Sequence, residues 1–471
     1  MSGPQISIVV TFHREGDVAR ATLRCLRMCR ERSALVGLSS ELIAVLDRCD
    51  VHTRAVVESE LRGDTTAVVL PVDFGDLGEA RNAGMARASG EYGCTVDGDD
   101  LISSNWLVAA HRRTSGPGYT RVVHPDYVLE FGAGRGITRL PDMDTDELPL
   151  AALLTCHPWT SCAFAPISAY RESPYPGSTG KNGGYGFEDW HWNLGQIALG
   201  RRHVTAGETV LFYRKRPDSL LVRQIGTHRI VAPTPFFSAE FFPRLIGASA
   251  PAVSEAVDSM ASAPTLGNGR ATLWHRWRGF WSRLTASTPD ASKPARNLSA
   301  KPPPLPPWIL SAATEMSTIE SEIPADAERL SEWKPWAASL RSAPGEVYAK
   351  LLSQIAAHGA LAAIALDVEP VRYETTYWPG AVVQLVTQAK QCSNLADEMV
   401  TSVDSAGERP CVLDISGDLG RLTEAEAQAV LVRLLVQLRP RVVLVRDGVG
   451  RRVVELHARA LSAAGVEVRH V

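Results

Sequence analysis

Short apolar runs alternate with segments of helical periodicity through the first half of the chain. Apolar and β-branched runs, which predict buried strands, lie at 6–10, 42–46, 67–72 and 92–96. Between these runs, apolar residues recur at helical spacing in 20–32 and 79–88. Strand, helix and strand in this order predict an α/β fold built from β-α-β units around a largely parallel sheet.

A proline-rich segment separates this half from a second region of regular pattern. Seven prolines lie among Ser, Ala, Thr and Lys between residues 285 and 307, which is typical of a linker. The regular pattern then resumes as strand 411–415, helix 423–437, strand 441–445, helix 452–464 and strand 466–468. We therefore expect an α/β domain at 1–245, a connecting segment at 246–307 and a smaller α/β region at 308–471.

The composition is that of an ordinary globular protein, with 45% hydrophobic and 21% charged residues. Lys and Arg total 49 against 52 Asp and Glu, which argues against a dedicated nucleic-acid binder. The eight cysteines form no Cys-x-x-Cys pair, so reduced thiols are expected. A signal-peptide pattern and an apolar run of membrane-spanning length are both absent, which predicts a cytoplasmic protein.

Three carboxylates follow directly after the strand predicted at 92–96, in the run Asp97-Gly98-Asp99-Asp100. Carboxylates this close repel one another, and a divalent cation offsets the repulsion. Asp97 and Asp99 are two residues apart, so on an extended backbone their side chains point the same way. The run predicts either a Mg²⁺ or Mn²⁺ site or a solvated turn.

A second acidic pair, Glu188-Asp189, follows a glycine-dense loop at 177–186 and precedes an amphipathic stretch at 190–199. Glycine allows such a loop to close over a ligand, although the same composition suits a plain surface loop. Further on, the cations Arg214 to Arg216 fit either a diphosphate or a solvated basic turn.

The segment before the first acidic run carries Ala-Arg-Asn-Ala-Gly at 80–84 and Ala-Ser-Gly-Glu-Tyr at 88–92. Together with the opening strand and the Thr11 turn, these motifs resemble the family 2 glycosyltransferases, which are nucleotide-sugar enzymes of the GT-A fold. The resemblance covers roughly residues 4–225. It departs from the family at Phe12 and His13, which replace Tyr and Asn, and the usual Asp-Gly-Ser is missing after Asp47.

The resemblance implies an inverting, metal-dependent transfer of a sugar from a nucleoside diphosphate sugar, with a UDP- or dTDP-sugar as the expected donor. The acceptor would be a hydroxyl of a glycan or of a lipid-linked glycan. Asp189 would be the catalytic base, with Glu188 as the second candidate for that role or as a supporting residue, and Asp97 and Asp99 would hold Mn²⁺ or Mg²⁺. The residues expected to bind the nucleotide sugar are Thr11, Glu15, Asp47, Arg81, Asp97, Gly98 and Arg214.

Two other functions fit the same residues, namely a noncatalytic scaffold that binds a glycan or a partner, and a nucleotidyltransferase. His124 and His157 favour packing or hydrogen bonding over metal binding. The Trp- and Arg-rich segment 273–284 suits peripheral contact with the inner face of the plasma membrane or docking on the protein's own surface. The C-terminal region loosely resembles the start of a GT-B glycosyltransferase, family 4, and is expected to be a partial Rossmann-like, noncatalytic unit.

Overall fold

The computed structural model describes most of the chain. The described residues are 3–114, 121–178, 183–247, 296–297, 305–326, 329–330, 341–357, 361–367, 381–387, 411–445 and 448–470. The amphipathic segment expected at 273–284 lies outside them. No helix among the described residues is long and apolar enough to cross a membrane.

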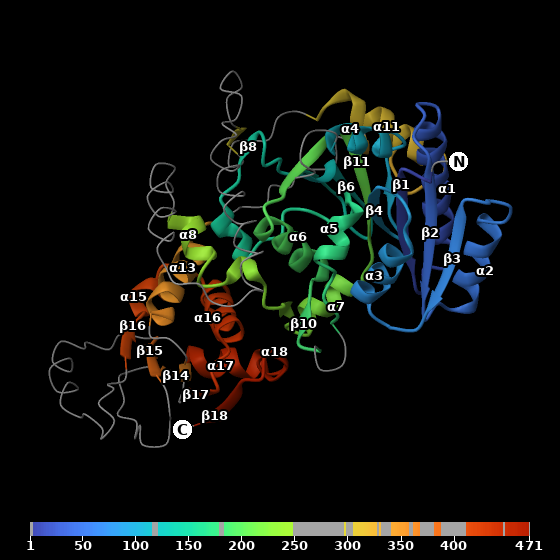
Figure 1. Ribbon diagram of the computed structural model, residues 1–471. Helices are drawn as coiled ribbons and strands as arrows, with labels where there is room; N and C mark the ends of the chain where they lie inside the picture. The colour runs from blue at the N-terminus through green and yellow to red at the C-terminus, as the bar shows by residue number, and fades with distance from the viewer. Residues whose placement is uncertain are drawn as a thin grey trace, which may run out of the picture.

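A mixed nine-stranded sheet forms the centre of the N-terminal part (Figure 1). Its order is β3-β2-β1-β4-β9-β6-β11-β5, with β7 added beside β6. The first four strands are parallel, whereas β9 is antiparallel to β4 and β6. The strands are β1 (Ile6–Phe12), β2 (Ser40–Asp47), β3 (Ala67–Val72), β4 (Tyr92–Asp97), β5 (Leu101–Ile102), β6 (Arg121–Gly132), β7 (Gly136–Arg139), β9 (Ala163–Pro166) and β11 (Arg202–Lys215).

Helices cover both faces of this sheet, which is why β1 is buried along its whole length. Val9 packs on one face with α3, and Ile8 and Val10 pack on the other with α1. The covering helices are α1 (Val18–Ala34), α2 (Val51–Glu60), α3 (Leu77–Arg87), α4 (Trp106–Thr114), α5 (Ile167–Glu172) and α6 (Glu188–Ala198). The strands and helices predicted for the first hundred residues are confirmed, with ends shifted by a few residues.

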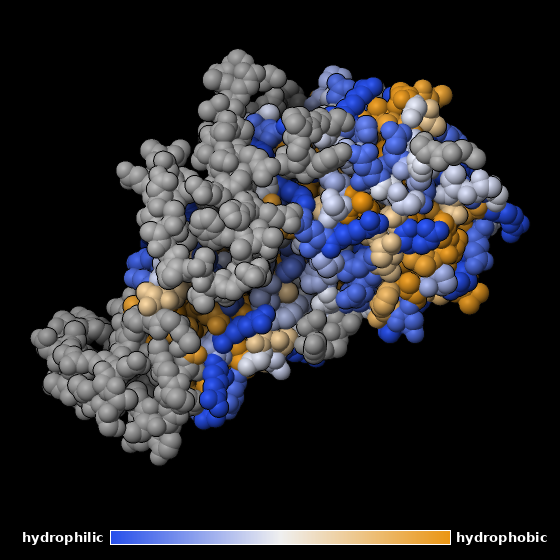
Figure 2. Space-filling model, in the orientation of Figure 1, coloured by the Kyte–Doolittle hydropathy of each residue, from blue (hydrophilic) through white to orange (hydrophobic). Residues whose placement is uncertain are grey.

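Short elements connect the sheet to the rest of the chain. They are β8 (Asp146–Glu147), η1 (Leu150–Leu154), β10 (Tyr185–Gly186), α7 (Leu220–Gly226), β12 (Ile230–Val231), η3 (Pro235–Phe237), α8 (Phe242–Gly247), β13 (Arg296–Asn297) and α11 (Pro307–Ser317). Hydrophilic and hydrophobic residues are interspersed over the visible surface of the described part (Figure 2).

The C-terminal region is a second α/β unit with a parallel sheet in the order β16-β15-β14-β17-β18. Its strands are β14 (Leu361–Asp367), β15 (Ala381–Val386), β16 (Cys411–Asp414), β17 (Val442–Val445) and β18 (Glu467–His470). Its helices are α13 (Ala343–Ala356), α15 (Ser416–Leu419), α16 (Glu424–Leu438), α17 (Val449–Leu456) and α18 (Ala458–Ala463). The sequence predicted the last three strands but not β14 and β15, and the helix expected at 452–464 is divided at His457.

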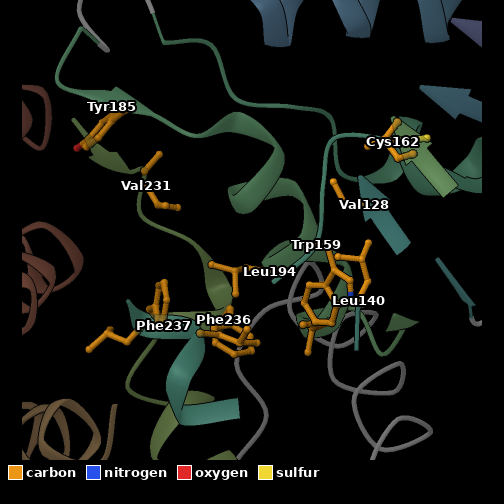
Figure 3. Close-up of a cluster of buried hydrophobic side chains, with 14 of the residues drawn as sticks. Val128, Leu140, Trp159, Cys162, Tyr185, Leu194, Val231, Phe236 and Phe237 are labelled. Atoms are coloured by element: carbon orange, nitrogen blue, oxygen red, sulfur yellow. The ribbon is translucent and has the colours of Figure 1, made fainter. Parts of the chain in front are cut away.

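The C-terminal region lies directly against the N-terminal part (Figure 1). Helix α13 packs on η1 and α8, and one buried hydrophobic cluster contains residues from Ile6 to Val466. Figure 3 shows part of this cluster, with Phe236 and Leu194 side by side. The domain boundaries at residues 245 and 307 therefore stay predictions.

Candidate active site

The ends of three parallel strands bring the first set of predicted site residues to one edge of the sheet. Strand β1 lies between β2 and β4, with Thr11 opposite Asp97, and Asp47 ends β2. Gly98 packs so closely that a Cβ atom would lie 2.5 Å from the Thr11 carbonyl oxygen. A glycine is therefore required where the acidic run turns away from the sheet.

Arg81 on α3 joins the two acidic sets that the sequence singled out. Its side chain is 2% exposed; Nη2 donates to Asp97 Oδ1 at 2.6 Å and Nη1 donates to Glu188 Oε1 at 2.8 Å. The two negative charges raise the pKa of Arg81 despite its burial, so it stays charged. Its guanidinium also lies 5.4 Å from the centre of the Tyr175 ring.

Asp97 and Asp99 in the acidic run also have partners other than Arg81. Asp97 Oδ2 accepts a hydrogen bond from Ser161 Oγ at 2.7 Å, and Asp99 forms an ion pair with Arg216 at 3.0 Å. Burial raises the pKa of Asp99, and the charge of Asp97 raises it further. Burial also raises the pKa of Glu15, and the negative charge of Asp99 raises it further. The Asp99 anion is therefore only partly compensated.

These carboxylates fit a divalent cation that binds together with a diphosphate. Among the described residues, no group of three or more His, Cys, Asp or Glu side chains is placed to hold a metal ion. An ion such as Mg²⁺, however, needs only one or two protein carboxylates, because phosphate and water oxygens supply the other ligands. Asp97 and Asp99 provide two such oxygen donors, and the raised pKa of Asp99 favours an added cation.

The second acidic pair begins α6. Phe187, the residue before it, has a left-handed backbone with φ of 56°, which turns the chain sharply into the helix. Burial raises the pKa of Glu188 to about 7, partly offset by Arg81. Burial also raises the pKa of Asp189, whose side chain is 25% exposed against 7% for Glu188. Asp189 is thus the more accessible of the two carboxylates.

Residues 7–123 match the family model described as glycosyl transferase family 2. The matched stretch, residues 7–123, is glycosyltransferase family 2 sequence. The match includes the Arg81 helix and the whole acidic run, and it agrees with the predicted family. With its mixed, helix-covered sheet, this glycosyltransferase domain has the GT-A fold that the sequence predicted. The GT-B resemblance of the C-terminal region is not confirmed.

Several solved structures are similar to this chain. TarS 1-349 from S. aureus in complex with UDP-GlcNAc is 18% identical, with 74% of this chain and 88% of that chain covered and a TM-score of 0.37. The mannosyltransferase PcManGT from Pyrobaculum calidifontis with GDP-Man and Mn²⁺ is 15% identical, with 61% and 84% covered and a TM-score of 0.35. Glucosyl-3-phosphoglycerate synthase from Mycobacterium tuberculosis is 17% identical, with 48% and 75% covered and a TM-score of 0.33. No curated protein matches the chain.

Two of the predicted donor-binding residues, Asp47 and Arg214, also have partners within the protein. Both Asp47 oxygens accept backbone hydrogen bonds, from the amides of Phe74 at 2.8 Å, Gly75 at 2.9 Å and Asp76 at 2.9 Å, and so hold the loop before α3. The guanidinium of Arg214 binds two glutamates and packs on a phenylalanine ring.

Arg214 contacts Glu320 and Glu322, which follow α11, and stacks 4.5 Å from the centre of the Phe131 ring. Its backbone amide donates to the buried Asp100 at 2.9 Å. Arg214 Nε also donates to the Asp99 carbonyl oxygen at 3.2 Å, whereas Arg216, which ends the same basic run and is 32% exposed, pairs with the Asp99 carboxylate. The donor-binding role of Arg214 stays a prediction, and Arg216 is a second cation placed for it.

His157 lies beside the more accessible acidic residue of the glycosyltransferase domain. Its Nδ1 is 3.8 Å from Asp189 Oδ2, its Nε2 is 2.8 Å from Asn193 Nδ2, and its ring stacks on Trp190. Burial lowers the pKa of His157 to about 3, so the ring is neutral. With Nε2 accepting from Asn193, the ring proton is on Nδ1 and faces Asp189. Only the short run around residues 156–159 marked this histidine in the sequence.

His124 is fully enclosed by protein groups. Its Nδ1 lies 3.1 Å from the Cys162 carbonyl oxygen and its Nε2 lies 2.8 Å from His203 Nδ1. Burial lowers the pKa of His124 to about 3. This residue serves packing and hydrogen bonding in the structure, as the sequence favoured.

Proposed function

We propose that this glycosyltransferase moves a sugar from a nucleoside diphosphate sugar, with a UDP- or dTDP-sugar as the expected donor, to a hydroxyl of a glycan or lipid-linked acceptor, with inversion. The observation that carries the proposal is the Arg81 bridge. It sets the acidic end of β4, suited to a metal-bound diphosphate, next to the carboxylates that begin α6.

The proton step is assigned to Asp189. Its Oδ1 accepts a hydrogen bond from the Trp190 amide at 2.8 Å, which leaves Oδ2 to take the proton of the acceptor hydroxyl. The raised pKa of Asp189 makes it a stronger base than an exposed aspartate. The acceptor oxygen then bonds to the anomeric carbon on the face opposite the diphosphate, whose bond to that carbon breaks. A single displacement of this kind inverts the configuration.

We propose that the diphosphate leaving group binds at the acidic end of β4. When bound, Mn²⁺ or Mg²⁺ held by Asp97 and Asp99 supplies positive charge to the diphosphate oxygens. Arg216 stands at Asp99 and provides a further cation on the same side. Thr11, Glu15 and Gly98 line the adjoining end of β1, where the nucleoside is proposed to lie.

Titration calorimetry with UDP-, dTDP- and GDP-sugars, with and without Mn²⁺, tests the assignment. We expect Asp99→Asn to weaken metal-dependent donor binding by about tenfold or more, as for loss of a charged ligand. Asp189→Asn should bind donor normally and lose transfer. Asp17→Asn, which changes an exposed carboxylate, is the matched control. Equal donor affinity with and without Mn²⁺, or undiminished transfer by Asp189→Asn, would contradict the proposal.

The cellular site remains part of the proposal. We infer that the enzyme works in the cytoplasm, with the segment 273–284 as a contact to the inner face of the plasma membrane. Co-sedimentation of the full chain with anionic vesicles, compared with a chain lacking 270–285, checks this contact. Equal co-sedimentation of the two chains would exclude it.

A further inference from the structure

We propose that the C-terminal region positions the start of α6, and that Arg433 is a positioning residue for the base Asp189. The inference rests on the proposed function, because that function makes Asp189 the base. It assigns a role in the reaction to a region in which no catalytic group is expected. The contacts that carry it all fall on residues 184–237 of the glycosyltransferase domain.

Arg433 on α16 makes the first contact. It is buried, and its Nη1 donates to the backbone carbonyl of Val231 at 2.8 Å and of Ala232 at 3.4 Å. Its guanidinium also lies 4.8 Å from the centre of the Phe237 ring. The described contacts of this buried cation are carbonyls and a ring rather than a carboxylate. Burying such a charge is unfavourable, so its hydrogen bonds have to be kept in place.

The first of these carbonyls belongs to strand β12 and the second to the residue that follows it. Val231 lies in β12, which pairs with β10 in parallel, and Gly186 of β10 is opposite Val231. The amide of Phe187, the next residue, donates to Gln224 Oε1 at 3.0 Å before the chain turns into α6. A displacement of β12 is therefore passed through β10 to the first residues of α6.

Helix α18 makes the second contact, on the glycine-dense loop itself. A Cβ atom built on Gly184 would overlap the backbone of Arg459 and Ala460, so the two backbones touch directly. Nearby, His457 Nδ1 lies 3.1 Å from the carbonyl oxygen of His228. The close approach of the C-terminal region thus explains why residue 184 of the loop is a glycine.

The same region also satisfies backbone groups that follow β12. The Thr234 amide donates to Gln437 Oε1 at 3.3 Å, and Tyr348 Oη donates to the Phe237 carbonyl at 2.7 Å. Buried backbone groups need such partners, so this stretch depends on the C-terminal region for its conformation. In Figure 3, Phe236 of this stretch faces Leu194 of α6, which gives a second route to the helix.

Hydrogen exchange of the full-length protein tests the proposal without any ligand. We expect Arg433→Met to speed amide exchange in residues 185–193 by about tenfold, the factor for one lost hydrogen bond to a charged group. Gly184→Ala should speed exchange in the same residues, because its Cβ atom would overlap the backbone of Arg459 and Ala460. Exchange in β1 should stay unchanged. The matched controls are Arg452→Met, at an exposed ion pair, and Gly226→Ala, where a Cβ meets open space.

Catalysis gives the second measurement, with UDP plus Mn²⁺ as the binding probe. We expect both variants to bind UDP with unchanged affinity and to lower kcat for the donor found active, with Arg433→Lys recovering part of the loss. Unchanged exchange in 185–193, or equally faster exchange in β1, would overturn the proposal. If Asp189→Asn transfers sugar normally, the proposed function fails instead, whatever the exchange result.

Discussion

Replacing Arg81 with methionine removes the cation that bridges Asp97 and Glu188. The guanidinium is 2% exposed and its two ion pairs measure 2.6 and 2.8 Å, so both carboxylates lose a partner, and water cannot readily replace it at Glu188, whose side chain is 7% exposed. Removing one member of a buried ion pair costs about 3–5 kcal/mol. We expect Arg81→Met to lower the free energy of unfolding by about this amount at pH 8.

The same variant should be less damaged in acid. Without Arg81 the pKa of Glu188, already raised to about 7 by burial, rises further. A carboxyl whose folded pKa is raised stabilises the protein below its unfolded pKa, and that contribution is lost as pH increases through the folded value. The difference between variant and wild type should therefore shrink as pH falls toward 7, by up to about 1.4 kcal/mol per pH unit for one proton, and change little below pH 7, where Glu188 is protonated in both proteins.

Urea unfolding, followed by tryptophan fluorescence at pH 5.5, 7 and 8.5, measures both effects. Arg48→Met is the control, because it breaks only an exposed pair with Asp73 and should cost less than about 1 kcal/mol at each pH. The double variant Arg81→Met/Glu188→Gln should regain part of the loss at pH 8. A loss for Arg81→Met that equals the control at every pH would refute the reasoning.

Three further outcomes are expected. The acid limb of the kcat/KM profile should lie above the ordinary aspartate range, because burial raises the pKa of Asp189; a limb at or below pH 4 contradicts this. Burial raises the pKa of Asp126 to about 6, so the free energy of unfolding of the wild type should fall as pH rises from about 4 to 6. In urea unfolding at both pH values, the free energy of unfolding of Asp126→Asn should fall by up to about 3 kcal/mol less than that of the wild type. Equal falls in the two proteins would count against this prediction. Gly84→Ala should cost about 1–3 kcal/mol in urea unfolding, since its Cβ would overlap Val9 and lie 3.0 Å from Val45; Gly207→Ala, in open space, is the control, and equal costs would exclude overpacking.

Local patterns were sufficient for the framework of the N-terminal domain. Strands of β-branched residues followed by helices predict a parallel sheet, and parallel strands carry their C-terminal ends to one edge. The acidic run after β4 and the turn after β1 could therefore be placed together, as Thr11 opposite Asp97 confirms. In the C-terminal region, β14 was missed because Leu361–Asp367 contains three alanines and suits a helix equally well.

The direction in which individual side chains at the site point could be determined only from the tertiary structure. Arg214 lies within β11, whereas Arg216 follows the end of the strand, where alternation no longer predicts direction. Only the packing of α11 brings Glu320 and Glu322 to Arg214 and leaves Arg216 to meet Asp99.

The sequence by itself determined which carboxylates follow which strand or loop, because that order depends only on neighbours along the chain. The tertiary structure alone decided which of them share a partner, since Arg81 joins Asp97 to a glutamate 107 residues further along the chain. It also decided how the C-terminal region contacts β12 and the loop before α6. Arg433 binds backbone carbonyls, which every residue possesses, so no pattern of side chains could have indicated that contact.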